Sequence, residues 1–172
     1  MELVVSTASS ADGTNFAVGD LSGYIHTSAD SGVTWIKQTG SGNRSWITIA
    51  SSSDGIKLAA ADLSGYLYTS QDSGTSWTAT TKSMNNTGNW MTITSSADGT
   101  SLAAAADSEN NDDKGHIYTS TDSGATWTEE SGAGEAPWSQ LASSSDASKL
   151  VAVSQNGYIY TGVEANYQAA AA

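Results

Sequence analysis

The chain lacks cysteine and has a single proline among its 172 residues. Without cysteine, neither a disulfide framework nor a cysteine-ligated metal site can form. No run approaches the roughly 18 to 20 apolar residues of a membrane-spanning helix, and Met1–Ser10 lacks the basic and apolar regions of a signal sequence. Six Lys and Arg against 18 Asp and Glu give a net charge of −12. Such a chain cannot build the cationic surface that sequence-independent nucleic-acid binding requires, so we expect no nucleic-acid partner. Because the chain has no long apolar run, we also expect no direct membrane insertion.

The residues that are abundant favour β-structure. There are 29 serines, 20 threonines and 17 glycines, a composition that disfavours long helices and suits short strands joined by tight turns. No segment keeps an apolar period of 3.6 residues beyond a turn or so. The sequence therefore predicts an all-β fold within one domain.

A repeat with spacings of 44 and 48 residues predicts the architecture. The segment Trp46–Gly55 recurs at Trp90–Gly99 and Trp138–Asp146, and earlier, without its tryptophan, at Leu3–Gly13. A period of about 40 to 50 residues in an all-β chain indicates β-propeller blades, each a four-stranded antiparallel meander. We expect about four blades in a single module, residues 1–168, with units at about 3–39, 46–81, 90–130 and 138–168. We set Ala169–Ala172 apart as a tail.

The second unit predicts the order of strands and turns within a blade. Asp54-Gly55 is a hairpin signal, because glycine tolerates the positive φ that such turns require. The expected strands are an innermost strand Trp46–Ser51, a second strand Lys57–Ala61, a third strand Tyr66–Ser70 and a short outer strand that follows the turn Asp72–Gly74 and ends at Trp77. In the fourth unit the corresponding turn has lost its motif, and Ala165–Ala169 is the segment available for an outer strand.

Three of these turns share one motif, S-x-D-x-G-x-[ST]-W, at Ser28–Trp35, Ser70–Trp77 and Ser120–Trp127. It resembles the Asp-box of sialidase-type (BNR) propeller repeats, and the repeat covers most of the chain. We expect each Asp to accept hydrogen bonds from the turn, each Gly to adopt a conformation that a Cβ would penalise, and each Trp to be buried against the next blade or under the turn. We interpret these residues as structural: Asp30, Gly32, Trp35, Asp72, Gly74, Trp77, Asp122, Gly124 and Trp127.

Four units are few for such a ring, since the resemblance implies six or more blades. Three explanations are open: a fragment of a longer ring, a ring completed by a second copy, or a small open solenoid. Because exposed terminal blades present unpaired edges and apolar faces, we favour a fragment or an assembly subunit.

The sequence shows no catalytic set. A sialidase would need three arginines to hold its substrate carboxylate, and this chain has Arg44 alone. Related GH74-type xyloglucan hydrolases use a pair of carboxylates, and Asp20, Asp62 and Asp107 follow the second strand in successive units. Since that position recurs from unit to unit, we interpret these carboxylates as loop-structuring. We expect no enzymatic activity, no catalytic residue and no cofactor, with a glycoside hydrolase-related propeller as the alternative.

Metal binding has only weak candidates. The acidic insertion of the third unit lacks the spacing of an EF-hand loop, and we interpret it as a solvated loop. Its carboxylates that offer oxygen ligands are Asp107, Glu109, Asp112 and Asp113. His26 and His116 sit at different strand positions and make no metal pair.

We therefore predict a non-enzymatic structural or protein-binding module within a larger extracellular or luminal assembly. The acidic, Ser/Thr-rich surface fits that setting, and the sequons at Asn43 and Asn85 offer glycosylation sites if the chain is secreted. The expected partner is a protein or further copies of this chain. We expect contact through the loops that differ most between units, Lys37–Ser45, Lys82–Asn89, Asp107–Lys114 and Glu129–Pro137.

Two alternatives remain open. One is carbohydrate recognition, in which Trp46, Trp90 and Trp138 line a face of the ring, although one tryptophan per unit at the same position favours a core role. The other is a luminal assembly factor of a membrane complex, because a photosystem-assembly factor is a related propeller. The basic contact surface that this resemblance implies has no counterpart in the chain.

Overall fold

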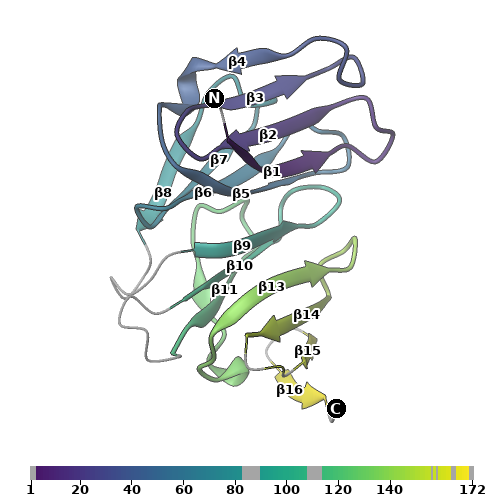
Figure 1. Cartoon of the computed structure of the whole chain (residues 1–172). Helices are drawn as coiled ribbons and strands as arrows, with labels where there is room; N and C mark the ends of the chain where they lie inside the picture. The colour runs from purple at the N-terminus through teal and green to yellow at the C-terminus, as the bar shows by residue number, and fades with distance from the viewer. Residues whose placement is uncertain are drawn as a thin grey trace.

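The structure, a computed structural model, describes residues 3–82, 90–107, 114–155, 157, 159–163 and 166–170. It contains four four-stranded antiparallel sheets, each a meander of consecutive strands. This is the all-β propeller-blade architecture that the repeat predicts. Figure 1 shows the four blades following one another from the N-terminus to the C-terminus.

The first two blades occupy the N-terminal half. Blade 1 consists of β1 (Val4–Ser9), β2 (Phe16–Asp20), β3 (Ile25–Ser28) and β4 (Ile36–Gln38). Blade 2 consists of β5 (Trp46–Ser51), β6 (Leu58–Asp62), β7 (Tyr66–Ser70) and β8 (Thr78–Lys82). A single 3₁₀ turn, η1 (Thr39–Ser41), lies between them.

The other two blades follow the same plan. Blade 3 consists of β9 (Trp90–Ser95), β10 (Leu102–Ala106), β11 (His116–Ser120) and β12 (Thr128–Glu129). Blade 4 consists of β13 (Trp138–Ser143), β14 (Lys149–Ser154), β15 (Ile159–Val163) and β16 (Asn166–Ala170). The 3₁₀ turn η2 (Ser131–Ala133) connects the two blades.

The outer strands differ from the sequence expectation. The strand expected to end at Trp77 begins instead at Thr78, because the tryptophan closes the Asp-box turn before the strand pairing starts. In blade 4 the outer strand runs to Ala170, where Ala169 pairs with Tyr160. Two of the alanines that we set apart as a tail therefore belong to the blade.

The innermost strands lie side by side in chain order. β1 packs against β5, β5 against β9, and β9 against β13. β1 and β13 share no such interface in the described part of the chain. The four blades therefore form an open arc (Figure 1).

Each blade has two unlike faces, because side chains alternate across a strand. The face toward the preceding blade, here called the aromatic face, carries Trp, Tyr and Leu; the face toward the following blade, the alanine face, carries smaller aliphatic residues. Between blades 2 and 3 the alanine face contributes Ala50, Ala59, Ala61 and Leu67, and the aromatic face contributes Trp90, Ile93, Leu102, Tyr118 and Trp127. Every interface therefore joins an alanine face to an aromatic face.

A buried Trp–Tyr pair anchors three of the four aromatic faces. The rings meet edge-on, with centroids 5.1 Å apart for Trp46 and Tyr68, and 5.5 Å apart for Trp90 and Tyr118. The indole N–H of Trp90 donates to the carbonyl of Gly65 in the preceding blade at 3.1 Å. The indole nitrogen of Trp46 is buried without a partner, and the equivalent carbonyl, that of Gly23, accepts the amide of Arg44.

Candidate binding surface at the connector face

The Asp-box turns are closed local structures. The Asp122 carboxylate accepts the backbone N–H of Thr126 at 2.8 Å and the Thr126 hydroxyl at 2.6 Å, and Ser120 donates to it at 2.8 Å. The indole of Trp127 donates to the Gly124 carbonyl. The boxes at Asp30 and Asp72 repeat this geometry. All three carboxylates are engaged in holding their own turns.

These hydrogen bonds stabilise the ionised carboxylates. The hydroxyl and amide of Thr34 hold the pKa of Asp30 at about 2, and those of Thr126 do the same for Asp122. The Ser76 hydroxyl and amide likewise lower the pKa of Asp72. A carboxyl group of this kind stays charged at neutral pH and is unsuited to act as a general acid.

The Asp-box tryptophans are not equally buried. Trp127 is 7% exposed and Trp77 is half-buried, whereas Trp35 is 44% exposed and stacks only on Phe16. The expectation that each would be buried is therefore wrong for Trp35. Its ring lies on the aromatic face of blade 1, which no preceding blade covers.

The tryptophans that begin the inner strands belong to the core. Trp46, Trp90 and Trp138 are fully buried at the interfaces between blades. A buried ring cannot stack on a sugar, so the hypothesis that these residues line a carbohydrate-binding face is wrong.

The repeated carboxylates after the second strands are buried within hairpin loops. Asp62 accepts hydrogen bonds from the backbone N–H groups of Ser64 and Tyr66, at 3.1 Å each, and from the Ser64 hydroxyl. Asp20 accepts the N–H of Ser22 at 3.0 Å. Both residues are 1% exposed and hydrogen-bonded within their own hairpins, so they structure their loops. Asp107 lies at the end of β10, half-buried.

The other candidate residues are only partly described. Glu109, Asp112, Asp113 and Asn85 lie outside the described residues, and among the described residues no group of three His, Asp or Glu side chains could hold a metal ion. His116 pairs with Glu129, with 3.1 Å between Nδ1 and Oε1, and half-buried His26 lies on β3. The sequon residue Asn43 is exposed.

The connector face is the side of the arc that carries the links between blades and the hairpins between second and third strands. Its links and hairpins interlock, because Arg44 and Gly23 exchange two backbone hydrogen bonds and Leu63 donates to Ser45. A shallow, wide-open cavity of about 390 Å³ lies there. Its lining is Asn43, Arg44, Ser45, Asp62, Leu63 and Ser64.

Arg44 is held on three sides. Its Nη1 lies 3.4 Å from Oδ2 of Asp62, its Nε donates to the Ser41 carbonyl at 3.3 Å, and its guanidinium lies 4.6 Å from the centroid of the Tyr68 ring. The rest of the side chain, 38% of its surface, faces solvent. The guanidinium is therefore fixed in place before any ligand arrives.

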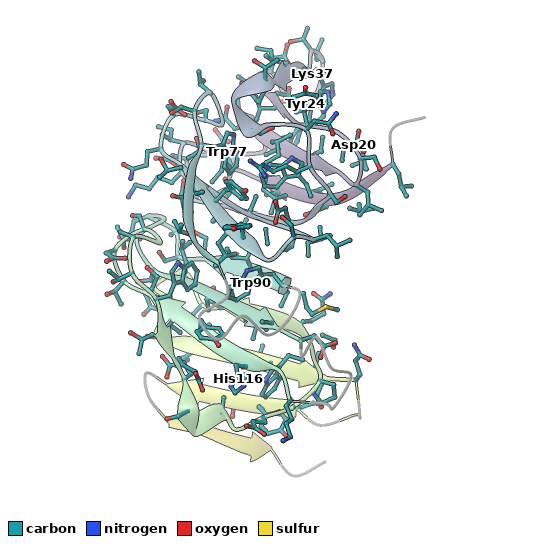
Figure 2. The ribbon with its side chains drawn as sticks, turned by 90° about the vertical axis from the view of Figure 1, so that its left-hand side faces the viewer. Asp20, Tyr24, Lys37, Trp77, Trp90 and His116 are labelled. Carbon is teal, nitrogen blue, oxygen red and sulfur yellow. The ribbon has the colours of Figure 1, made fainter. Side chains whose placement is uncertain are left out.

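Exposed apolar and aromatic groups lie on the hairpin of blade 2 that borders this cavity and on blade 1. Leu63 is 49% exposed and Tyr66 is 37% exposed. On blade 1, the Lys37 ammonium lies 4.0 Å from the centroid of the Tyr24 ring (Figure 2). We call the set Tyr24, Lys37, Asn43, Arg44, Leu63 and Tyr66 the connector surface; Tyr24 and Arg44 are half-buried and the other four are exposed.

The sequence foresaw only part of this surface. Lys37, Asn43 and Arg44 fall in the expected contact loop Lys37–Ser45. Leu63 and Tyr66 lie in a hairpin that recurs from unit to unit, whereas the sequence predicts contact at loops that differ between units. The loop Glu129–Pro137 behaves differently, since its Ala133 and Ala136 are buried in the core. Residues 83–89 and 108–113 of the other two expected loops lie outside the described residues.

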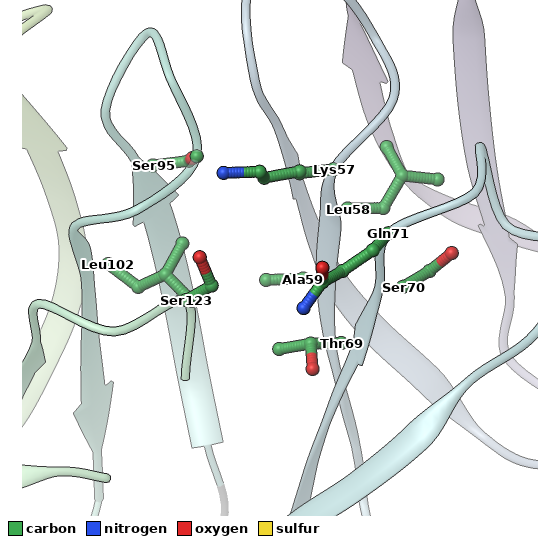
Figure 3. A pocket seen from close by; sticks show the side chains of 10 residues that line it. Lys57, Leu58, Ala59, Thr69, Ser70, Gln71, Ser95, Leu102 and Ser123 are labelled. Atoms are coloured by element: carbon green, nitrogen blue, oxygen red, sulfur yellow. The ribbon is translucent and has the colours of Figure 1, made fainter. Parts of the chain in front are cut away.

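The volume of the cavity between neighbouring blades is greater where the Asp-box is missing. The crevice between blades 2 and 3 holds a cavity of only about 10 Å³; Figure 3 shows Lys57 and Thr69 facing Leu102 and Ser123 across it. The equivalent crevice between blades 1 and 2 holds about 70 Å³. Between blades 3 and 4, where no Asp-box turn from blade 4 enters, the cavity is about 350 Å³.

In the described part of the chain, no helix has the length and apolar character needed to cross a membrane.

The comparisons with known proteins support the fold. No protein-family model and no curated protein matches the chain. Among solved structures, YCF48 from Cyanidioschyzon merolae superposes with a TM-score of 0.69 at 16% identity over 99% of this chain, and a YCF48 structure bound to D1 peptide gives 0.68. A chain of a nidogen–laminin complex gives 0.75 at 16% identity over 98%, and the GH74 enzyme of Niastella koreensis gives 0.70 at 15% over 91%.

These structures are longer than the chain. It spans 56% of the Cyanidioschyzon YCF48 chain, 64% of the nidogen–laminin chain and 27% of the GH74 enzyme. At such low identity the likeness shows a propeller fold of the kind found in these proteins. It matches part of a larger propeller in each case.

Proposed function

We propose that the chain is a non-enzymatic interaction module that binds a protein partner through the connector surface. The observation that carries the proposal is the fixed guanidinium of Arg44 at a cavity of about 390 Å³, beside exposed Leu63 and Tyr66. Arginine and tyrosine are enriched among residues that dominate binding energy at protein interfaces.

The chemistry of the surface indicates what it binds. Arg44 lines the cavity and Lys37 lies over the Tyr24 ring of blade 1, so two of the six cationic side chains of a strongly acidic chain belong to the connector surface. Leu63 and Tyr66 add apolar area next to them. The fitting ligand is a protein segment with a carboxylate next to an aromatic or aliphatic side chain.

Structural relatives support a protein ligand. One YCF48 structure holds a D1 peptide, and another similar chain belongs to a nidogen–laminin complex. The engagement of Asp20, Asp62 and the Asp-box carboxylates within their own loops supports a non-enzymatic role. The acidic surface and the exposed sequon at Asn43 support an extracellular or luminal setting.

A random peptide library displayed on phage tests this proposal. The protein is made in bacteria, because a glycan on Asn43 would occupy the cavity that this residue lines. The enriched peptides are then measured against the double variant Leu63→Ser/Tyr66→Ser and the control Val33→Ser/Ile36→Ser, which replaces two exposed apolar side chains of blade 1.

We expect acidic-apolar peptides whose affinity falls by about tenfold or more in the Leu63/Tyr66 variant, a loss of roughly 1.4 kcal/mol, and stays unchanged in the control. Equal binding by both variants, or enrichment of peptides without a carboxylate, contradicts the proposal.

A further inference from the structure

The two ends of the arc carry unlike, uncovered blade faces. Blade 1 exposes its aromatic face, including Val4 and Trp35, because none of the other three blades covers it. Blade 4 exposes its alanine face, where Val151 is 37% and Ile159 is 47% exposed. The residues of blades 2 and 3 at the positions of Val151 and Ile159 are buried: Ala59, Leu67, Ala103 and Ile117.

A relay of backbone hydrogen bonds crosses all three interfaces and is incomplete at both ends. The hairpin of each blade donates to the next: Ala11 N–H to Ser53 carbonyl at 2.8 Å, Ser53 to Ala97 at 2.7 Å, and Ala97 to Ser145 at 2.6 Å. The Ser145 N–H and the Ala11 carbonyl have no hydrogen-bond partner within the described residues. One end of the arc therefore offers a donor and the other an acceptor, at equivalent positions.

Side-chain size is matched across the same hairpins. A Cβ on Gly55 would lie 2.4 Å from Asn15 of the preceding blade, and a Cβ on Gly99 would lie 2.8 Å from Lys57. Between blades 3 and 4, the position of Asn15 and Lys57 is held by the small Ser101, and the position of Gly55 and Gly99 is held by Ala147. Both residues line one cavity. Long side chains therefore meet glycine, and the short one meets alanine.

The open ends obey the same rule. At the glycine position of blade 1, Gly13 has nothing within 4 Å of where its Cβ would be. At the matching position of blade 4 stands Lys149, which is exposed. Lys149 would meet Gly13 of a second copy as Lys57 meets Gly99, with its ammonium near Asp12.

The Asp-box glycines give an independent match. A Cβ on Gly74 would lie 3.1 Å from Thr27 of the preceding blade, and one on Gly124 would lie 2.8 Å from Thr69. The corresponding glycine of blade 1, Gly32, has only its own blade nearby. Blade 4 keeps the threonine, Thr161, and leaves it exposed.

We propose that two copies of the chain pair through these faces, with blade 4 of each copy packed on blade 1 of the other. Around a two-fold axis both contacts form at once and close an eight-bladed ring, within the size range of propellers. Each contact continues the alanine-to-aromatic interface already present three times in the chain. This inference is argued from residues outside the connector surface.

Sedimentation equilibrium of the 172-residue chain tests the pairing. We expect a dimer of twice 17.6 kDa that dissociates on dilution. Val151→Arg places a charge on the pairing face of blade 4 and should raise the dimer dissociation constant by about 100-fold or more, since the ring contains that face twice. The control Ile56→Arg adds the same charge to an exposed position of blade 2 and should leave dimerisation unchanged, with both variants folded by circular dichroism.

Cysteine cross-linking identifies the contact itself, because the chain has no native cysteine. Ala11→Cys/Ser145→Cys should form a covalent dimer on oxidation, whereas Ser53→Cys/Ala97→Cys should close within one chain, as the relay places both residues side by side. A chain that stays monomeric at high concentration overturns the proposal. So does a dimer unaffected by Val151→Arg, or growth into open filaments. In the monomeric case these faces would bind other blades or another partner.

Discussion

Trp127 and Trp35 occupy the same place in the same motif, yet one is 7% exposed and the other 44%. Their local turns are alike, with each indole donating to the glycine carbonyl of its Asp-box at 3.1 Å. Only the surroundings differ, because a preceding blade covers blade 3 and none covers blade 1. The motif therefore builds the turn, and the neighbouring blade provides the burial.

The largest expected effect comes from truncating these two tryptophans. Trp127→Ala should lower the free energy of unfolding by about 3–5 kcal/mol, because it empties a packed interface. Trp35→Ala should cost less than about 1 kcal/mol in the monomer, because much of its ring is already in water. Urea unfolding followed by far-ultraviolet circular dichroism, at a concentration below dimer formation, measures both. Equal losses would mean that the turn, and not the neighbouring blade, determines the role of the tryptophan.

The crevices give a second comparison at equivalent positions. Ala59→Val should destabilise the protein by about 1–3 kcal/mol, because it overpacks an interface with a cavity of about 10 Å³. Ala103→Val lines the cavity of about 350 Å³ between blades 3 and 4 and should cost less than about 1 kcal/mol. Chemical unfolding of the two single variants provides the test. A larger loss of unfolding free energy for Ala103→Val than for Ala59→Val would show that the cavity between blades 3 and 4 cannot accommodate the added methyl groups.

The buried indole nitrogens allow a finer comparison. Trp90→Phe removes a hydrogen bond to Gly65 and leaves that carbonyl without its donor, whereas Trp46→Phe removes an N–H that has no partner. Both changes lose similar ring volume, so Trp90→Phe should be the more destabilising by about 1 kcal/mol. Thermal unfolding with matched wild-type controls measures the difference. The reverse order would contradict the assigned hydrogen bond.

The smallest expected difference concerns the Asp-box carboxylates. The pKa values of Asp30 and Asp122 should both be about 2, although one blade is at the end of the arc and the other is in the middle. These pKa values are lower in the folded protein than in the unfolded chain. At pH values between the folded and the unfolded pKa, the folded state therefore binds fewer protons than the unfolded state. The stabilisation is present above about pH 4 and is lost as the pH falls through about 2. Carboxyl carbon shifts in an NMR titration report each group, and a pKa near 4 for Asp30 alone would show that the turn depends on its neighbour.

The sequence predicted the blade plan because the repeat reports it directly. The innermost strand Trp46–Ser51 and the third strand Tyr66–Ser70 are confirmed to the residue. The outer strand was misplaced because Trp77 looks like a strand residue, while its indole closes a turn with Gly74. Periodicity alone cannot distinguish these two roles for an aromatic side chain.

The connector surface was harder to predict, for a physical reason. The motif residues of one blade interact within that blade, so their roles can be read from local sequence. Arg44 contacts Asp62 and Tyr68 of the following blade, and Gly23 of the preceding one. Such contacts depend on how far the chain turns between blades, which no local pattern records.

The most direct test of the central claim, that the arc ends in two matching interfaces, is amide hydrogen exchange of the Ser145 N–H at two protein concentrations. The N–H groups of Ser53 and Ala97 serve as internal references, because they occupy the same relay position inside the arc. We predict that Ser145 is protected like them where the chain is dimeric, and exchanges rapidly on dilution while the references stay protected. Rapid exchange of Ser145 in the dimer would contradict the account.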